Sequence, residues 1–465
     1  MNLRPAVAAA WSAIALMATC VPAPAQTTPD LAEQALVKRG EYLAIAGDCA
    51  ACHTPTGGRP YAGGVALATP VGDILSTNIT PSKTHGIGND NLLQFSDALR
   101  RGLDANGDHL YPAMPYAAYA RITDDDVRAL YAYFMHGVAP VDASPPRTRL
   151  PFPFDIRASM AVWNLLFLSR APFRPDSGKG QEWNRGAYLV RGLAHCGACH
   201  SPRNLLMAED ASRELAGGTV GAWYAPNITS DVASGIGGWT VPEIVAYLRD
   251  GHAQGKAQAA GPMEEAIDHS LSQLSENDLN AIAVFIKTVP AVHDAADVRP
   301  RYDWGAATDD LATIRGVPLP NDPDRMSGPQ VYDAWCATCH QAQGQGSFDG
   351  GMPPLFHDST MGSRNSDDLV MVMLDGTQRG GAKPGVAMPS FAQLSDRQLA
   401  ILGTWLATRY GNPDARVTEG QVRTLRGGGP SSNIVTITRV ALAVVVGSIL
   451  AVVWIFFPRK RGTSR

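Results

Sequence analysis

Three copies of one short cysteine and histidine pattern carry the most evident chemistry in this sequence. Each copy reads C-x-x-C-H; the copies are Cys49, Cys52 and His53, then Cys196, Cys199 and His200, then Cys336, Cys339 and His340. On a helix, residues three and four apart share one face, so both thiols and the imidazole of a copy would point the same way. A c-type haem is attached by two thioether bonds from such cysteines and one bond from the histidine to iron. The sequence therefore predicts three covalently bound haem c groups.

Zinc half-sites and redox-active dithiols are the other chemistries that use cysteines at this spacing. A zinc site leaves the histidine after each pair unexplained, and a dithiol exchanger does not come in threes. The seventh cysteine, Cys20, lies near the N-terminus, within the predicted signal peptide. We therefore expect neither a disulfide nor a thiolate ligand in the mature chain.

Methionines beside prolines are the expected sixth ligands of the three irons. Met114, Met263 and Met388 each stand next to a proline, which favours a loop that can reach the far face of a haem. The other methionines considered are interpreted as loop or packing residues, or as too close to a motif: Met135, Met207, Met352, Met361, Met371 and Met373. The predicted iron ligands are thus His53 with Met114, His200 with Met263, and His340 with Met388. Such closed centres exchange electrons and do not bind substrate.

An internal repeat relates the surroundings of the first two motifs. R-G-x-Y-L stands at 39–43 and 185–189, N-I-T at 78–80 and 227–229, and G-I-G at 86–88 and 235–237. Met114 matches Met263 in the same register. We therefore predict two homologous modules, followed by a divergent third.

Each module is predicted to end in an amphipathic helix that begins at a polar capping residue. The pairs are Thr123 with Asp126, Ser275 with Asp278, and Ser395 with Gln398, each a cap with an acceptor three residues on. Apolar residues at helical spacing follow each pair. No strand-rich segment intervenes. The predicted fold class is therefore mostly α, with three tandem cytochrome c-like domains and one C-terminal transmembrane helix.

Both ends of the chain carry membrane-targeting signals. Residues 1–25 have a short basic start, an apolar stretch and the small-residue pattern of a cleaved signal peptide. Residues 440–457 carry no charge and, as a helix, are long enough to cross the hydrocarbon core of a bilayer. We expect haem domains in the periplasm, an anchor in the inner membrane, and a cytoplasmic tail at 458–465.

Proline-rich and glycine-rich stretches predict the boundaries between modules. The predicted units are a first cytochrome c domain at 26–139, a linker with a short apolar helix at 140–178, a second domain at 179–291, a linker at 292–324, a third domain at 325–412, a linker at 413–433 and the transmembrane helix at 434–457. The apolar stretch 160–168 belongs to no motif. It is either a helix packed across the first two modules or a patch for a partner or the membrane surface.

Length and charge narrow the function classes. A chain of 465 residues exceeds what one core usually organises, so two to four domains are expected. A formal net charge of -4 lacks the basic excess that nucleic-acid binding requires. We expect no nucleic-acid partner.

The motifs together resemble a known family. The three C-x-x-C-H copies, T-N-I-T-P at 77–81 and L-Y-P-A-M-P at 110–115 are similar to the tri-haem cytochrome c subunit of bacterial membrane-bound dehydrogenases that oxidise alcohol, aldehyde, gluconate, sorbitol or fructose. The resemblance covers nearly the whole mature chain. It implies a large catalytic subunit with a quinone, flavin or molybdopterin cofactor, possibly a small subunit, and ubiquinone as the electron acceptor. Many relatives are described as attached through amphipathic surfaces, whereas this chain has a full C-terminal span.

A second, local resemblance concerns the third motif. The stretches at 344–346 and 353–355 are similar to a single-domain cytochrome c, in which a proline carbonyl orients the axial histidine. Pro353 or Pro354 is expected to do so for His340.

Three functions stay open on the sequence. The favoured one is an electron-transfer subunit without a substrate-oxidising site of its own, serving an alcohol or aldehyde dehydrogenase in preference to a sugar or gluconate enzyme. The alternatives are a haem enzyme with one open or labile iron, and an electron conduit to a terminal oxidase.

Overall fold

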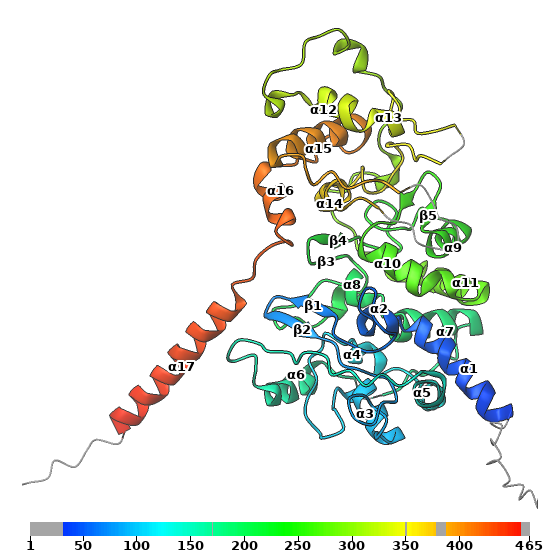
Figure 1. Cartoon of the computed structure of the whole chain (residues 1–465), viewed down its shortest axis with the longest axis vertical. Coiled ribbons are helices and arrows are strands. Elements are labelled where there is room, and N and C mark those ends of the chain that lie inside the picture. The colour runs from blue at the N-terminus through cyan, green and yellow to red at the C-terminus, as the bar shows by residue number, and fades with distance from the viewer. Residues whose placement is uncertain (1–30, 170, 349–350, 378–386, 457–465) are drawn as a thin grey trace, which may run out of the picture.

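A computed structural model describes residues 31–169, 171–348, 351–377 and 387–456. The predicted signal peptide at 1–25 and the predicted tail at 458–465 lie outside the described residues. Figure 1 shows an elongated body with most of the first module in the lower part, the second in the middle and the third at the top; the first and second motifs both lie near the middle.

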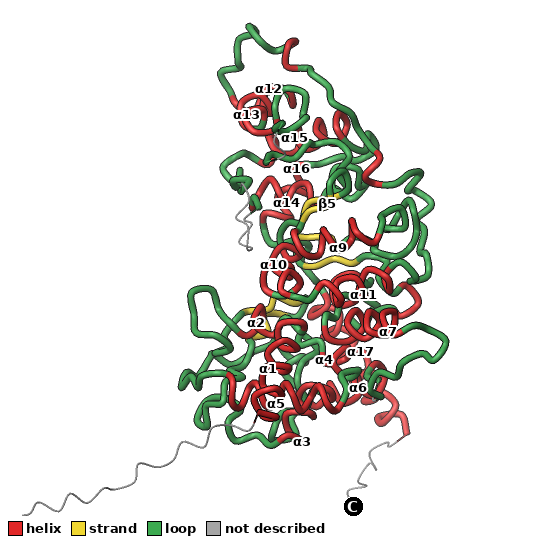
Figure 2. Tube along the Cα trace, turned by 90° about the vertical axis from the view of Figure 1, so that its right-hand side faces the viewer, coloured by secondary structure: helices red, strands yellow, loops and turns green. Residues whose placement is uncertain are grey.

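Helices and loops make up most of the described chain (Figure 2), as predicted. The first module contains α1 (Leu31–Ala46), α2 (Cys49–His53), β1 (Ala66–Thr69), β2 (Gly72–Leu75), α3 (Leu92–Arg101), α4 (Tyr116–Tyr119), α5 (Asp124–Ala132) and η1 (Tyr133–Gly137), and is followed by η2 (Arg157–Ser159) and α6 (Met160–Phe167). The second contains α7 (Gln181–Tyr188), η3 (Leu189–Leu193), α8 (Gly197–His200), η4 (Ala211–Arg213), β3 (Gly218–Val220), β4 (Trp223–Ala225), α9 (Val241–Asp250), β5 (His252–Ala253), β6 (Ala257–Gln258), α10 (Pro262–His269), η5 (Leu271–Gln273) and α11 (Glu276–Ile286).

The rest of the described chain also consists of short helices joined by loops. Short turns η6 (Arg301–Asp303), η7 (Leu311–Thr313) and η8 (Pro323–Arg325) lead to α12 (Gly328–Trp335), α13 (Ala337–His340), α14 (Asp367–Asp375), α15 (Asp396–Tyr410), α16 (Glu419–Arg426) and α17 (Ile434–Phe456). The strands of the described residues form three small antiparallel hairpins, β1 with β2, β3 with β4, and β5 with β6.

The first helix of each module packs on its last helix: α1 on α5, α7 on α11, and α12 on α15. Glycine permits the close approach in the first two pairs. A Cβ on Gly40 would stand 1.9 Å from the carbonyl oxygen of Ala129, and one on Gly186 would stand 1.9 Å from that of Ala281. Both glycines belong to the repeated R-G-x-Y-L motif. The close approach of the two helices explains why glycine occupies that place in both modules.

The predicted helix caps are present at all three final helices. The side chains of Thr123, Ser275 and Ser395 accept hydrogen bonds from the backbone N–H three residues on. Of these three caps, Ser395 alone forms a reciprocal capping box, in which the side-chain oxygen of Gln398 accepts a hydrogen bond from the backbone N–H of Ser395. The carboxylates of Asp126 and Asp278 bind other partners and do not close a box.

Those carboxylates join the first two modules reciprocally. Asp126 accepts hydrogen bonds from Arg39 of its own module, at 3.0 Å, and from Tyr188 of the second module, at 2.5 Å. Asp278 accepts from Arg185 of its own module, at 2.7 Å, and from Tyr42 of the first, at 2.6 Å. Because each tyrosine crosses to the other module, the two modules contact each other as the halves of a symmetric dimer do.

The buried core is continuous across the first two modules and separate in the third. Buried side chains of both the first and the second module, among them Leu43, Leu130, Leu189 and Ile282, belong to one continuous cluster. The third module has a cluster of its own, with Tyr332, Leu399 and Tyr410 fully buried. The first two modules therefore behave as one packing unit, against which the third is added.

Two segments predicted as linkers are ordered and packed. In 292–324, Arg301, Trp304 and Leu311 are buried. In 413–433, Thr418 caps α16, whose Val422 and Leu425 are buried against the third module. Proline and glycine content marked these stretches as connections, but apolar residues at helical spacing let α16 add to the core.

The apolar stretch 160–168 forms α6 and contacts both of the first two modules. Asn164 accepts a hydrogen bond from Tyr116 at 2.8 Å, and the indole N–H of Trp163 donates to the carbonyl of Leu206 at 2.9 Å. Val162, Leu165 and Leu166 remain exposed. The helix thus packs across the modules and also presents an apolar face.

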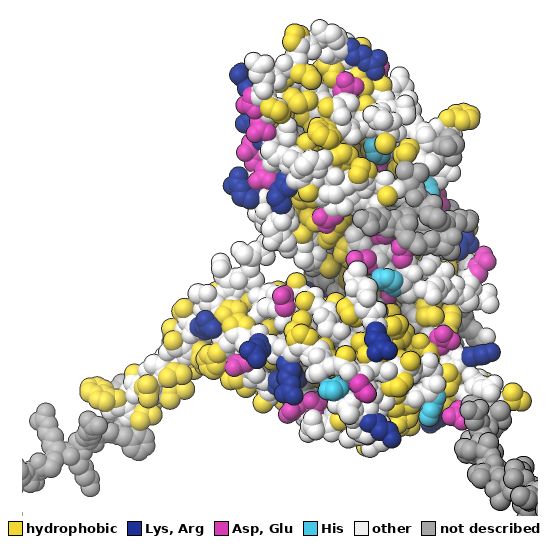
Figure 3. Space-filling model, viewed as in Figure 1, with side chains coloured by type: hydrophobic (Ala, Val, Ile, Leu, Met, Phe, Trp, Pro, Cys, Tyr) yellow, Lys and Arg dark blue, Asp and Glu magenta, His cyan; other side chains and the backbone are white. Residues whose placement is uncertain are grey.

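One described helix is long and apolar enough to cross a membrane. Residues Ile434–Trp454 of α17 have a mean hydropathy of 2.2, and none of that window is buried. Figure 3 shows hydrophobic side chains along this helix, which extends away from the body. At its start, Arg439 donates a hydrogen bond to the carbonyl of Phe152 at 2.8 Å.

Candidate haem centres

The three motif histidines share one hydrogen-bond pattern. The Nδ1 atom of His53 lies 2.7 Å from the carbonyl oxygen of Thr77, that of His200 lies 2.7 Å from Pro226, and that of His340 lies 3.1 Å from Pro353. A carbonyl acceptor requires the proton on Nδ1, which leaves the Nε2 lone pair for a metal. Burial lowers the pKa of all three histidines, which favours the neutral form that metals bind.

The motif cysteines lie on short helices that begin at unusual backbone positions. Asp48 and His195, each directly before the first cysteine of a motif, have φ values of 49° and 36°. The six cysteines are not joined in disulfides. Burial raises the pKa of Cys49, Cys196 and Cys336 to about 12. A redox-active dithiol lowers its thiol pKa instead, so these surroundings do not suit thiol exchange, and two thiols with one imidazole on a short helix suit a covalently bound haem.

The structure brings the predicted methionine ligands of the first two modules into the core that their cysteines contact. Met114 and Met263 are partly buried against the cluster that Cys49 and Cys196 also contact. Met388 is half-buried in the third module, where its backbone bridges to Thr377 at 2.9 Å. Met361, Met371 and Met373 are buried in the apolar cluster of the third module, in line with their interpretation as packing residues, and Met207 is exposed on a loop.

The first and second motifs lie close together. Helix α2 contacts α10, which carries Met263. The pKa of Cys52 is raised mainly by burial, next by the negative charge of Asp48, and then by Cys199 of the second motif. Tyr119 of the first module donates to the carbonyl of Gly47 at 2.7 Å, and its ring meets that of His195 at 5.6 Å between centroids. Haems attached at these two motifs would therefore be neighbours.

The carbonyl groups that face two of the three motif histidines were not predicted from the sequence. The carbonyl acceptors Thr77 and Pro226 were missed, although both stand just before the repeated N-I-T; Pro353 was expected, and its carbonyl is the acceptor for His340. The repeat contained this information, because Thr77 and Pro226 occupy the same place in it.

Replacing Met388 with Ala is expected to lower the reduction potential of one haem, because thioether ligation raises it. The vacated position should also let the reduced protein bind carbon monoxide at one haem. A potentiometric titration and a carbon monoxide difference spectrum measure both effects. Met207→Ala, on an exposed loop, is the control that should leave both unchanged; an unaltered titration of Met388→Ala would exclude Met388 as a ligand.

Comparison with known sequences gives a consistent family relationship. The family model described as cytochrome c matches residues 37–137, and the model described as cytochrome C oxidase, cbb3-type, subunit III matches residues 323–406. These ranges contain the first and third motifs. Neither range includes Cys196, so a haem at the second motif is a prediction from that motif and from the repeat.

Three curated relatives cover most of the chain. The fructose dehydrogenase cytochrome subunit of Gluconobacter japonicus is 42% identical over 99% of both chains. The gluconate 2-dehydrogenase cytochrome c subunit of Pantoea cypripedii is 39% identical over 85% of this chain and 91% of its own. The cytochrome c subunit of the quinone alcohol dehydrogenase of Gluconacetobacter polyoxogenes is 37% identical over 86% of each.

Proposed function

The chain belongs to the cytochrome c subunits of membrane-bound dehydrogenase complexes, and from this membership we propose that it carries three haems that relay electrons from a catalytic subunit to membrane ubiquinone. The observation that carries the proposal is the threefold recurrence of a C-x-x-C-H helix whose histidine Nδ1 faces a backbone carbonyl. Each such helix can hold one haem through two cysteines and the histidine Nε2.

The proposed ligand sets are His53 with Met114, His200 with Met263, and His340 with Met388. A bound haem supplies reversible one-electron chemistry. The chain's own residues attach it, fix the imidazole through a carbonyl and shield it in an apolar core. The alternative of an open iron is tested by carbon monoxide, which should not bind to the unaltered reduced protein.

The partner is proposed to be a sugar-oxidising dehydrogenase in the first place. The alcohol or aldehyde type was favoured on the sequence, but the fructose dehydrogenase relative matches 99% of both chains, more than the gluconate and alcohol relatives do. The proposed partner carries the catalytic cofactor, a quinone, flavin or molybdopterin. The present chain is proposed to have no substrate-oxidising site of its own.

The membrane arrangement is proposed from α17 and the N-terminal signal. An exported N-terminus followed by one span leaves the haem modules in the periplasm and the tail in the cytoplasm. Arg439 lies where α17 meets the segment before α6, so the exposed apolar face of α6 is proposed to lie near the bilayer surface.

Co-purification tests the proposed function. The full chain is extracted from membranes in mild detergent, the large subunit that accompanies it is identified, and reduction of a ubiquinone analogue is followed with fructose, gluconate and ethanol in turn. The proposal expects a dehydrogenase subunit and substrate-dependent quinone reduction that is lost when the large subunit is removed. Full donor-to-quinone activity by the isolated chain would contradict it, and a co-purifying terminal oxidase would favour the conduit.

Deleting every residue after Asn433 is expected to convert the protein into a soluble periplasmic form that retains its haems. The reason is that α17 is the one described helix apolar enough to span a bilayer. Membrane fractionation and the haem content of both fractions measure the effect. A chain that ends after Phe456 keeps α17 whole and serves as the membrane-bound control; a truncated form that stays in membranes would assign the attachment to α6.

A further inference from the structure

Arg301 is a buried cation whose hydrogen bonds go to backbone carbonyls. Among the residues described, it is the one basic residue that is buried, with 9% of its surface exposed. Its guanidinium donates to the backbone carbonyls of Asn227, at 2.9 Å, and of Ser234. Within the described part of the chain, no ion pair joins it to a carboxylate, and burial lowers its pKa despite the opposing fields of Asp297, Tyr224 and Asp368. Burying an unpaired charge is costly, so a buried arginine points to an anionic ligand.

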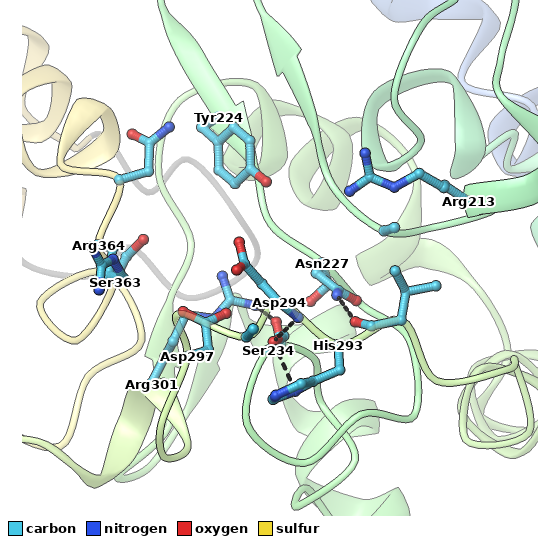
Figure 4. A pocket seen from close by; sticks show the side chains of 14 residues that line it. Arg213, Tyr224, Asn227, Ser234, His293, Asp294, Asp297, Arg301, Ser363 and Arg364 are labelled. Atoms are coloured by element: carbon cyan, nitrogen blue, oxygen red, sulfur yellow. Dashed lines mark hydrogen bonds between the residues drawn. The ribbon is translucent and has the colours of Figure 1, made fainter.

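Arg301 lines a cavity of about 570 Å³ at the junction of the second and third modules (Figure 4). Arg213 and Tyr224 face the same space from the second module, and Arg364 from the third. The carboxylates of Asp294 and Asp297 also line it, so the three arginines exceed the carboxylates of the lining by one charge. Three arginines and a phenol around one cavity form a set of donors suited to carboxylate groups.

The cavity adjoins the second haem motif. Pro226, whose carbonyl faces His200, directly precedes Asn227, which holds Arg301. A haem bound through His200 carries two propionate carboxylates, and these are the anions that the cavity can pair with.

We propose that Arg301 binds a propionate of the haem attached at Cys196 and Cys199, and thereby raises the reduction potential of that haem above the potential of its counterpart in the first module. This inference rests on the proposed haem at His200. Reduction of the iron by one electron removes one positive charge, so a fixed cation nearby favours the reduced form.

The first module lacks the corresponding groups. Asn78 and Asn227 bind the carbonyls of Val141 and Val292 alike, at 2.7 Å. At the same spacing beyond these valines, the first module has the buried Leu150 where the second has Arg301. Arg301 is therefore a charge that the second site has and the first lacks at the corresponding position.

Three substitutions in the full detergent-solubilised chain test the assignment by potentiometric titration. Arg301→Leu and Arg301→Gln are expected to lower the reduction equilibrium constant of one haem at least tenfold, which is 59 mV for a one-electron step. Arg301→Lys, which keeps the charge, should lower it less than threefold. The affected step must be the one that Met263→Ala also moves, since that identifies the haem of the second module.

Arg299→Leu is the matched control, because Arg299 is exposed two positions away and stacks on Trp304. It removes the same charge and should leave all three steps unchanged. If Arg301→Leu and Arg301→Gln stay within threefold of the unaltered protein, or if Arg299→Leu shifts the same step equally, the assignment is overturned. Loss of one haem in Arg301→Leu but not in Arg301→Lys would support the assignment, because it shows that a positive charge at position 301 helps to hold that haem.

Inorganic phosphate separates the propionate from a free anion. A step that shifts more than threefold as phosphate is added to the unaltered protein would mean that the cavity takes an external anion, and would overturn the propionate assignment. The haem content is measured first: fewer than three haems in the unaltered chain contradicts the proposed function, whereas three haems without an Arg301 effect contradict only this inference.

Discussion

Gly186→Ala is expected to lower the free energy of unfolding of the first two modules by about 3 kcal/mol. The new Cβ would stand 1.9 Å from the carbonyl oxygen of Ala281, a backbone atom that no side-chain rotation can move away. Helices α7 and α11 must separate to accept it, and their separation disturbs the core that both modules share. Denaturant unfolding followed by far-ultraviolet circular dichroism measures the loss.

Gly180→Ala is the control for this prediction. Gly180 stands just before α7, and nothing lies within 4 Å of a Cβ placed on it. Its midpoint of unfolding should match that of the unaltered chain. If Gly186→Ala unfolds at the same denaturant concentration as Gly180→Ala, α7 and α11 are not packed as closely as described here.

Asp278→Ala is expected to cost about 3 kcal/mol of stability, because it removes the shared acceptor of a charged and a neutral donor. The carboxylate is buried, with 10% of its side chain exposed, whereas Arg185 is about one third exposed, so solvent screening lowers the loss from the upper end of the range for buried pairs. Tyr42, in the other module, loses its hydrogen bond at the same time. Thermal or denaturant unfolding measures the effect.

A double-mutant cycle of Asp278→Ala with Tyr42→Phe isolates the contact between modules. We expect a coupling energy of about 1 kcal/mol, since the pair is in direct contact. Asp250→Ala, which removes an exposed ion pair with Arg249 on α9, should change stability by less than about 0.5 kcal/mol. Strict additivity of Tyr42→Phe and Asp278→Ala would mean that the modules are not linked through this hydrogen bond.

The same carboxylate gives this contact a pH dependence. Burial alone would raise the pKa of Asp278, but hydrogen bonds from Arg185 and Tyr42 outweigh it and hold the pKa below its usual value. Its stabilisation is therefore complete at neutral pH and is lost as the pH falls below the unfolded value of about 3.9 towards the lower folded pKa.

Local sequence signals predicted local structure well. Thr123, Ser275 and Ser395 begin the helices that were expected there, because a capping side chain acts on the backbone of its own first turn. The acceptors three residues on, Asp126 and Asp278, do not bond back to their caps. Their carboxylates bind arginine and tyrosine residues far away in the chain, and no window of neighbouring residues contains those partners.

Non-local packing accounts for the other differences. Proline and glycine marked 292–324 and 413–433 as connections, but the burial of Trp304 and Val422 depends on surfaces supplied by residues far away in the chain. The haem motifs were readable because attachment chemistry fixes their spacing. The proposed role of Arg301 could not be predicted from the sequence, because it depends on a cavity that the second and third modules enclose together.

The reciprocal contacts between the first two modules have a consequence for the direction of electron flow. Two halves that contact each other through matching residues offer an electron the same path in either direction, so the contacts they share set no preferred direction. A downhill gradient must come from residues that break the symmetry, and from whatever docks at each end. Fusion of two like units into one chain permits this, because a substitution can then alter one half without altering its twin.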